Sequence, residues 1–340
     1  MPLPVPSRRK LPPVPDVLSL AGETLLSPLV LFFALGAAAG FARSDLTIPD
    51  AVAKGLSLYL MLAIGFKGGA AMAAHGLGPE VLAALAVGIA LSFALPLLAF
   101  PVLRGLCRLD AVNAAAVAAH YGSISVVTFV AATSMLQTLG VAWDGYMVAV
   151  VAAMETPAIL TGLWLAGRSG ARLGESSGAL GREVLLNGSV VLLVGSFAIG
   201  WITGDKGLAT ISAFIVDPFK GVLCLFLLDM GLVAARRFRD GSVVNARLVA
   251  FGLLLPPVGA LAGGLLGLAA GLAPGNATLM AVLGASASYI AVPAAMRMAL
   301  PQANPAISIT LALGITFPLN LTIGIPLYHA VITSLTGGAP

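Results

Sequence analysis

From about residue 25 to its end, the chain alternates long apolar stretches with short polar ones. A helix that crosses a membrane needs about 20 mostly apolar residues. By that measure the chain contains ten candidate spans, five before residue 168 and five after it. The predicted ranges are 25–42, 49–73, 79–103, 112–137, 143–167, 182–202, 211–235, 247–271, 276–299 and 304–335. We therefore expect an all-α membrane protein of about ten transmembrane helices.

Composition supports a membrane protein over a soluble one. Hydrophobic residues make up 59% of the 340 positions and charged residues only 9%, and the mean hydropathy is +1.02. A soluble domain needs more charge to cover its surface. The formal net charge of +4 does not indicate nucleic-acid binding, because the basic residues are spread over short loops. We expect a multi-pass protein of a bacterial inner (plasma) membrane with no nucleic-acid partner.

The chain divides into two halves and two polar segments. Residues 1–20 are rich in proline and show no apolar signal-peptide core, so we expect a flexible tail there. The polar residues 169–181 are the expected cytoplasmic linker. They separate a first half, 21–168, from a second half, 182–340.

Three sequence matches relate the two halves. AKGLSLYLMLAIGFKGG (53–69) resembles FKGVLCLFLLDMGLVAA (219–235), YGSIS (121–125) resembles ASASY (285–289), and METP (154–157) resembles GITFP (314–318). The starting positions differ by 166, 164 and 160 residues, a nearly constant offset. An odd number of spans in each half requires the two copies to insert with opposite topology. The sequence therefore predicts two inverted five-helix repeats, a design found in many secondary transporters.

The arginines predict the orientation in the membrane. Alternate loops contain most of them, whereas the opposite side has Lys206 and the basic cluster 8–10. The arginines of the first set are Arg43, Arg104, Arg108, Arg168, Arg172, Arg182, Arg236, Arg237, Arg239, Arg247 and Arg297. Because positive residues favour the cytoplasmic side, this set is expected inside and both termini outside.

Two matched spans contain residues that weaken a helix. The span 112–137 has a glycine followed by serines, and the span 276–299 has the same pattern ahead of Pro293. Helix breaks at membrane depth persist where they line a cavity or pack within protein, and each helix start carries about half a positive charge. Two such starts aimed at one point suit a monovalent anion, although packing by small residues also enriches these types. The predicted substrate-binding residues are Gly122, Ser123, Ser125, Gly284, Ser286 and Ser288.

A second set of residues is predicted to bind a coupling cation. Glu155 lies near the middle of the span 143–167, where a charge is costly and usually functional. A structural hydrogen bond is the alternative role for this carboxylate. Hydroxyl and amide oxygens are the hard ligands that sodium prefers. The coupling candidates are Thr128, Glu155, Thr156, Thr316 and Asn320.

Enzyme motifs are missing from the sequence. It contains no HExxH and no Walker or dinucleotide-binding glycine pattern. The two cysteines, Cys107 and Cys224, lack metal-ligand spacing. We therefore expect no enzymatic activity, no cofactor, and no metal beyond sodium. A membrane channel or sensor stays open as an alternative to a transporter.

At three segments the chain resembles the sodium-dependent bicarbonate symporter family of the SbtA type. These segments are METPAIL (154–160), GASASYIAVPAAMRMALPQANPA (284–306) and GITFPLNLTIGIPLY (314–328). The resemblance implies ten spans, inverted repeats and two broken helices that cross near the substrate. It implies sodium-coupled uptake of bicarbonate by alternating access, with another small anion such as a short monocarboxylate as the rival substrate. It also implies that Ser123, Ser125, Ser286 and Ser288 line the bicarbonate and sodium site.

The chain departs from this family pattern at two acids and one loop. Family members carry Asp where this chain has Tyr289, and Asp where it has Glu155. The loop through which members meet a PII-like regulatory protein is much shorter here, at 168–183. We therefore expect no strong contact with such a regulator, and we expect a homo-oligomer.

Overall fold

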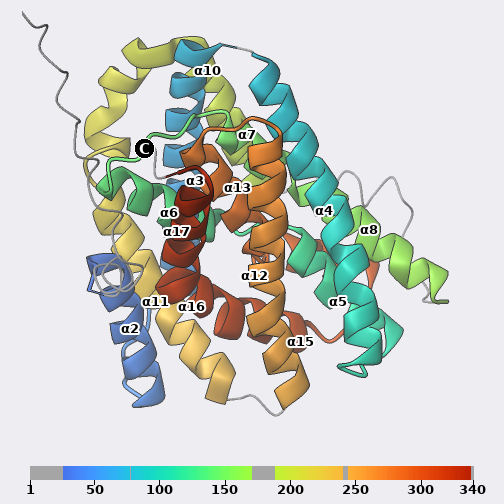
Figure 1. The fold of residues 1–340 in the computed structure, drawn as a ribbon. Coiled ribbons are helices and arrows are strands. Elements are labelled where there is room, and N and C mark those ends of the chain that lie inside the picture. Colours follow the sequence, from blue (N-terminus) through green and yellow to red (C-terminus); the bar gives the residue numbers. More distant parts are fainter. Residues whose placement is uncertain (1–25, 77, 171–187, 240–243, 338–340) are drawn as a thin grey trace, which may run out of the picture.

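The computed structural model describes residues 26–76, 78–170, 188–239 and 244–337, which contain helices and no strand (Figure 1). The helices are α2 (Pro28–Phe41), α3 (Asp50–His75), α4 (Pro79–Gly105), α5 (Ala111–Gly122), α6 (Val126–Thr138), α7 (Met147–Ala153), α8 (Glu155–Arg168), α10 (Gly188–Ile215), α11 (Phe219–Arg239), α12 (Ala246–Ala269), α13 (Pro274–Ala285), α14 (Ala291–Ala299), α15 (Pro305–Ile309), η1 (Thr310–Thr316), α16 (Phe317–Leu319), η2 (Asn320–Gly324) and α17 (Ile325–Leu335). The predicted tail (1–20) and nearly all of the predicted linker (169–181) lie outside the described residues.

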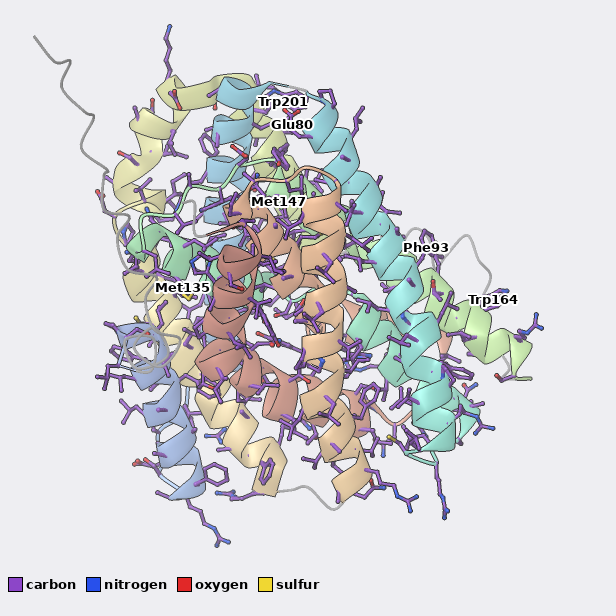
Figure 2. The ribbon with its side chains drawn as sticks, viewed as in Figure 1. Glu80, Phe93, Met135, Met147, Trp164 and Trp201 are labelled. Atoms are coloured by element: carbon purple, nitrogen blue, oxygen red, sulfur yellow. The ribbon has the colours of Figure 1, made fainter. Side chains whose placement is uncertain are left out.

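Many of these helices have the length and composition of membrane spans. Seven segments of the described chain qualify: Asp50–Ala74, Pro79–Gly105, Ala111–Thr138, Met147–Arg168, Val191–Ile215, Ala246–Ala269 and Pro305–Leu335. Helix α2 is apolar but shorter. The all-α, multi-pass prediction is thus confirmed, and ten crossings stay a prediction. Figure 2 shows Phe93 and Trp164 on the outer surface, 43% and 55% exposed, as expected of side chains that face lipid.

One predicted boundary is wrong. Residues 203–210 contain several polar side chains and were expected to form a loop around Lys206. In the structure α10 continues through them to Ile215 and bends at Gly204, whose φ is 56°. Glycine adopts this left-handed conformation without a Cβ penalty, so the chain turns there while residues on both sides stay helical.

The helices pack in two groups. The first group is α2, α3, α10 and α11, in which α2 lies along α11 and α3 along α10. The second group holds the remaining helices, with α4 packed on α5, α5 on α8, and α12 on α13. Glycines bring these partners close: a Cβ at Gly36 would meet the Leu228 carbonyl, and one at Gly259 would meet the Gly284 carbonyl. Small residues at membrane-helix contacts allow such close approach.

Several arginines gather at one end of the molecule. In Figure 1 the ends of α2 and α11 and the start of α12 lie along the lower edge, and the α3–α4 connection lies along the upper one. The Arg236 guanidinium donates to the Leu46 carbonyl (3.1 Å), and that of Arg239 donates to the Gly40 carbonyl (2.7 Å). These bonds tie the end of α11 to the connection after α2.

Candidate functional site

Both predicted helix breaks are present. Helix α5 ends at Gly122 and α6 begins at Val126, whereas α13 ends at Ala285 and α14 begins at Ala291. The residue after α5, Ser123, has φ −92° and ψ 164°. The residue after α13, Ser286, has nearly the same extended conformation, φ −87° and ψ 162°. Each break therefore leaves helix-end N–H and C=O groups that need other partners.

The two breaks contact each other through hydrogen bonds. The backbone N–H of Ser125 donates to the Ser286 hydroxyl (3.1 Å), and the N–H of Ser288 donates to the His120 carbonyl (2.8 Å). The Ser125 hydroxyl caps α6 by accepting from the Thr128 N–H (3.2 Å). Backbone groups that a membrane cannot hydrate are thus paired across the crossing.

A small cavity of about 10 Å³ lies beside this crossing. The starts of α6 and α14 lie beside it, so the positive ends of two helices converge there, and Glu155 of α8 completes the lining. No arginine or lysine is among its lining residues. These are Met61, Ile124, Ser125, Val126, Glu155, Ser288, Tyr289 and Ile290.

Three buried polar atoms at the breaks lack a hydrogen bond to any described residue: His120 Nε2, Ser123 Oγ and Tyr289 Oη. The Nδ1 atom of His120 lies 2.7 Å from the Ala116 carbonyl, so it carries the proton and leaves Nε2 as an acceptor. The Tyr289 hydroxyl is directed towards the Ser125 side chain without the geometry of a hydrogen bond. Burying a polar group unpaired costs free energy, so three of them together indicate a place for water or a ligand.

Glu155 is the first residue of α8 and only 5% exposed. Its carboxylate lines the cavity, and no described residue forms a hydrogen bond or ion pair with it. The negative charge of a carboxylate buried in this way must be neutralised, either by a bound cation or by a proton. The structure therefore brings Glu155 together with Ser125 and Ser288 from the two breaks.

A comparison with protein families matches residues 28–333 to the Na+-dependent bicarbonate transporter superfamily. The chain belongs to this superfamily. The match includes both breaks and every residue that lines the cavity. No curated protein matches the sequence. The resemblance seen in the sequence is thus confirmed, and with it the class of membrane transport proteins.

Ser92 of α4, to which sequence reasoning assigned no role, contacts the junction of α7 and α8. Its hydroxyl donates to the Met154 carbonyl and accepts from the Ala158 N–H (3.1 Å). Met154 and Ala158 are four residues apart, so the Ser92 hydroxyl bridges a carbonyl and an N–H of one helical turn beside Pro157. A signal was available, because Ser92 is the only hydroxyl-bearing residue between Glu80 and Arg104.

Two predicted coupling residues have structural partners instead of lining the cavity. The Thr316 hydroxyl donates to the Gly252 carbonyl (2.8 Å) and accepts from Tyr121 (2.7 Å). The Asn320 amide donates to the Ala285 carbonyl (2.8 Å) and accepts from Tyr328 (3.0 Å). They belong to the π-helical segments η1 and η2, so they fix this span against α12 and the second break.

The remaining predicted residues lie near the breaks without lining the cavity. A Cβ at Gly122 would clash with Pro96, and one at Gly284 would clash with the Gly259 carbonyl, so both glycines serve close packing. Thr128 is buried in the first turn of α6, and Thr156 is half-buried beside Glu155.

Lys67 lies over the Phe219 ring at 4.3 Å from its centroid. This contact is a cation–π interaction between α3 and α11, two helices of the first group.

Proposed function

We propose that this protein is a secondary active transporter that couples sodium entry to uptake of bicarbonate. The observation that carries the proposal is the cavity where the two helix breaks meet beside the Glu155 carboxylate. Its lining has partial positive charge from helix ends and no basic side chain, which suits a small monovalent anion better than a multivalent one. Membership of the Na+-dependent bicarbonate transporter superfamily supports bicarbonate as that anion.

The residues at the cavity divide into two proposed roles. The first N–H groups of α6 and α14, with the hydroxyls of Ser125 and Ser288, donate to the anion's oxygens. The Glu155 carboxylate attracts sodium, which offsets the carboxylate's charge and so removes its repulsion of the anion, whose own charge is offset by the helix ends. Binding of each ion then favours binding of the other, which is the requirement for symport.

The size of the cavity supports alternating access. About 10 Å³ accommodates one water-sized group at most, whereas bicarbonate has four heavy atoms. The breaks must therefore separate to admit the substrate. A shift of the α2–α3–α10–α11 group against the other helices supplies such a movement, because the pairs α2–α11 and α3–α10 pack far more extensively than any pair that joins the two groups.

Three features support the proposed inverted repeats. Helices α5 and α13 are both 12 residues long, and their bounds differ by 163 residues at each end. The residues that follow them share one backbone conformation. The pairs α2 with α11 and α3 with α10 each join a helix of the first half to one of the second half.

Uptake of labelled bicarbonate into proteoliposomes tests the function. We expect saturable uptake driven by an inward sodium gradient and lost when potassium replaces sodium. Formate and acetate should compete weakly. Sodium-independent flux that does not saturate would point to a channel, and stronger inhibition by a monocarboxylate would replace bicarbonate as the substrate.

Two variants test the site itself. Ser125→Leu and Ser286→Leu should abolish uptake, because the added bulk fills the crossing. Ser334→Leu is the matched control, since Ser334 is exposed on α17 and bonds within its own helix. Wild-type uptake by both break variants would remove the crossing from the transport path.

A further inference from the structure

A second concave site lies on the outer surface and shares no lining residue with the cavity at the helix breaks. It is a groove of about 570 Å³ between the end of α4 and the start of α12, called here the α4–α12 groove. Its volume is within the range of about 300–1,000 Å³ that is usual for ligand sites. The lining includes Leu98, Val102, Leu254 and Val258 along its length, with Arg108 and Arg247 at one end.

The arginine end of the groove has an unbalanced positive charge. No acidic residue is among the lining residues, and Arg108 and Arg247 form no ion pair with the described part of the chain. The Arg247 side chain has one long bond to the Leu106 carbonyl (3.5 Å), which leaves most of its donors available. The nearby carboxylate of Asp110 is occupied by the Asn113 backbone and side chain (2.9 and 2.6 Å).

The length of the groove matches one leaflet of a bilayer. From Arg247 to Val258 the α12 helix rises about 16 Å, at about 1.5 Å per residue. The hydrocarbon core of a bilayer is about 30 Å thick, so one leaflet contributes about half of it. Charged groups therefore lie at headgroup level when the apolar walls lie at acyl-chain level, an arrangement used by headgroup-binding sites between transmembrane helices.

We propose that the α4–α12 groove binds an anionic phospholipid. Its phosphate accepts hydrogen bonds from Arg108 and Arg247, which suit the planar geometry of phosphate recognition. One acyl chain lies against the walls formed by Leu98, Leu254 and Val258, which are 45%, 67% and 47% exposed. A second copy of the chain fits less well, because a symmetric contact at this face would bring the same arginines together.

Thermal unfolding of the purified protein in detergent provides the test. Phosphatidylglycerol should raise the midpoint temperature, whereas phosphatidylcholine with the same acyl chains should have little effect. In the double variant Arg108→Gln/Arg247→Gln, the phosphatidylglycerol concentration that gives half of the maximal rise in midpoint temperature should increase at least about tenfold. The matched control is Arg43→Gln/Arg237→Gln, which removes the same charge from exposed positions outside the groove.

A third variant keeps the test decisive if the double-arginine variant does not fold. Leu254→Trp fills the apolar wall without changing charge, and it should also weaken the response to phosphatidylglycerol. An undiminished response in either folded groove variant, or an equal response to phosphatidylcholine or to glycerol phosphate alone, overturns the proposal. A change of oligomeric mass in these variants without a change in lipid response would assign the groove to a second copy. None of these outcomes depends on transport activity, so the test is independent of the proposed transport function.

Discussion

At the scale of single residues, Ser92 ties α4 to the junction of α7 and α8. Its hydroxyl bonds to both the Met154 carbonyl and the Ala158 N–H at this buried junction. Ser92→Ala removes both bonds, so we expect a loss of about 1–3 kcal/mol in the free energy of unfolding. Thermal unfolding in detergent measures it.

The control for Ser92 is Thr138→Ala. The Thr138 hydroxyl bonds only to the Ser134 carbonyl one turn earlier in its own helix and is only partly buried. Its removal should have a much smaller effect. Equal effects of the two substitutions would mean that Ser92 does not stabilise the junction.

Glu155 is the residue where a substitution separates sodium binding from proton binding. Its carboxylate is buried at the cavity without a protein partner. If sodium supplies the offset, Glu155→Gln raises the sodium concentration for half-maximal uptake about tenfold or more and changes the maximal rate less. Uptake measured against sodium at two pH values checks this.

Glu155→Asp is the matched variant for that measurement, because it keeps the charge and should keep the sodium dependence. Loss of pH dependence in Glu155→Gln with an unchanged sodium curve would indicate a proton instead. Unchanged sodium curves at both pH values would remove Glu155 from the coupling site.

Sequence reasoning located some of these residues and not others for physical reasons. A carboxylate in an apolar span is conspicuous, so Glu155 could be found. The breaks could be found because Gly and Ser weaken helices at matched positions. The sequence could not show that Thr316 and Asn320 lie away from the cavity, since the π-helical segments η1 and η2 alter the residues per turn and hence the face on which each side chain lies, and their role in coupling stays a prediction.

At the scale of elements, the boundary between the two helix groups is the place where movement is expected. Helix α3 of the first group contacts α7 of the second, and a Cβ at Gly68 would lie 2.8 Å from that of Val148. A disulfide joins Cβ atoms about 3.8 Å apart. In a chain without Cys107 and Cys224, Gly68→Cys/Val148→Cys should form a disulfide that stops uptake, and reduction should restore it.

A second cysteine pair is the control for this cross-link. Gly40→Cys/Ala235→Cys joins α2 to α11 within one group at a similar separation, 2.7 Å between the Cβ positions. That disulfide should leave uptake unchanged. Full uptake by the oxidised Gly68–Val148 pair would show that these groups do not move against each other during transport.

The elements also show where hydropathy patterns stop being informative. Most predicted span ends agree with the helices to within a few residues, because the spans are long and apolar. Residues 203–210 were misassigned because Lys206 and neighbouring polar residues resemble a loop, whereas α10 continues and bends at one glycine. A left-handed glycine inside a helical segment leaves no hydrophobic pattern to read.

At the scale of the whole molecule, the orientation in the membrane follows from which loops carry arginine. Bonds from Arg236 to Leu46 and from Arg247 to Leu106 join connections that the sequence placed on one side. The positive-inside rule predicts that this side is cytoplasmic. The start of α2 is then predicted to be external. Four predicted crossings separate it from the connection between α6 and α7, so that connection is predicted to be external as well.

Single cysteines in a chain without Cys107 and Cys224 test this orientation. Ala142→Cys, exposed in the α6–α7 connection, should react with a membrane-impermeant maleimide in intact cells. Ser44→Cys, exposed after α2, should react only after the cells are permeabilised. Each position serves as the control for the other, since both are accessible in detergent. Labelling of both positions in intact cells would show that they are not separated by an odd number of crossings. The inverted arrangement of the two halves would then fail, because it requires each half to cross the membrane an odd number of times.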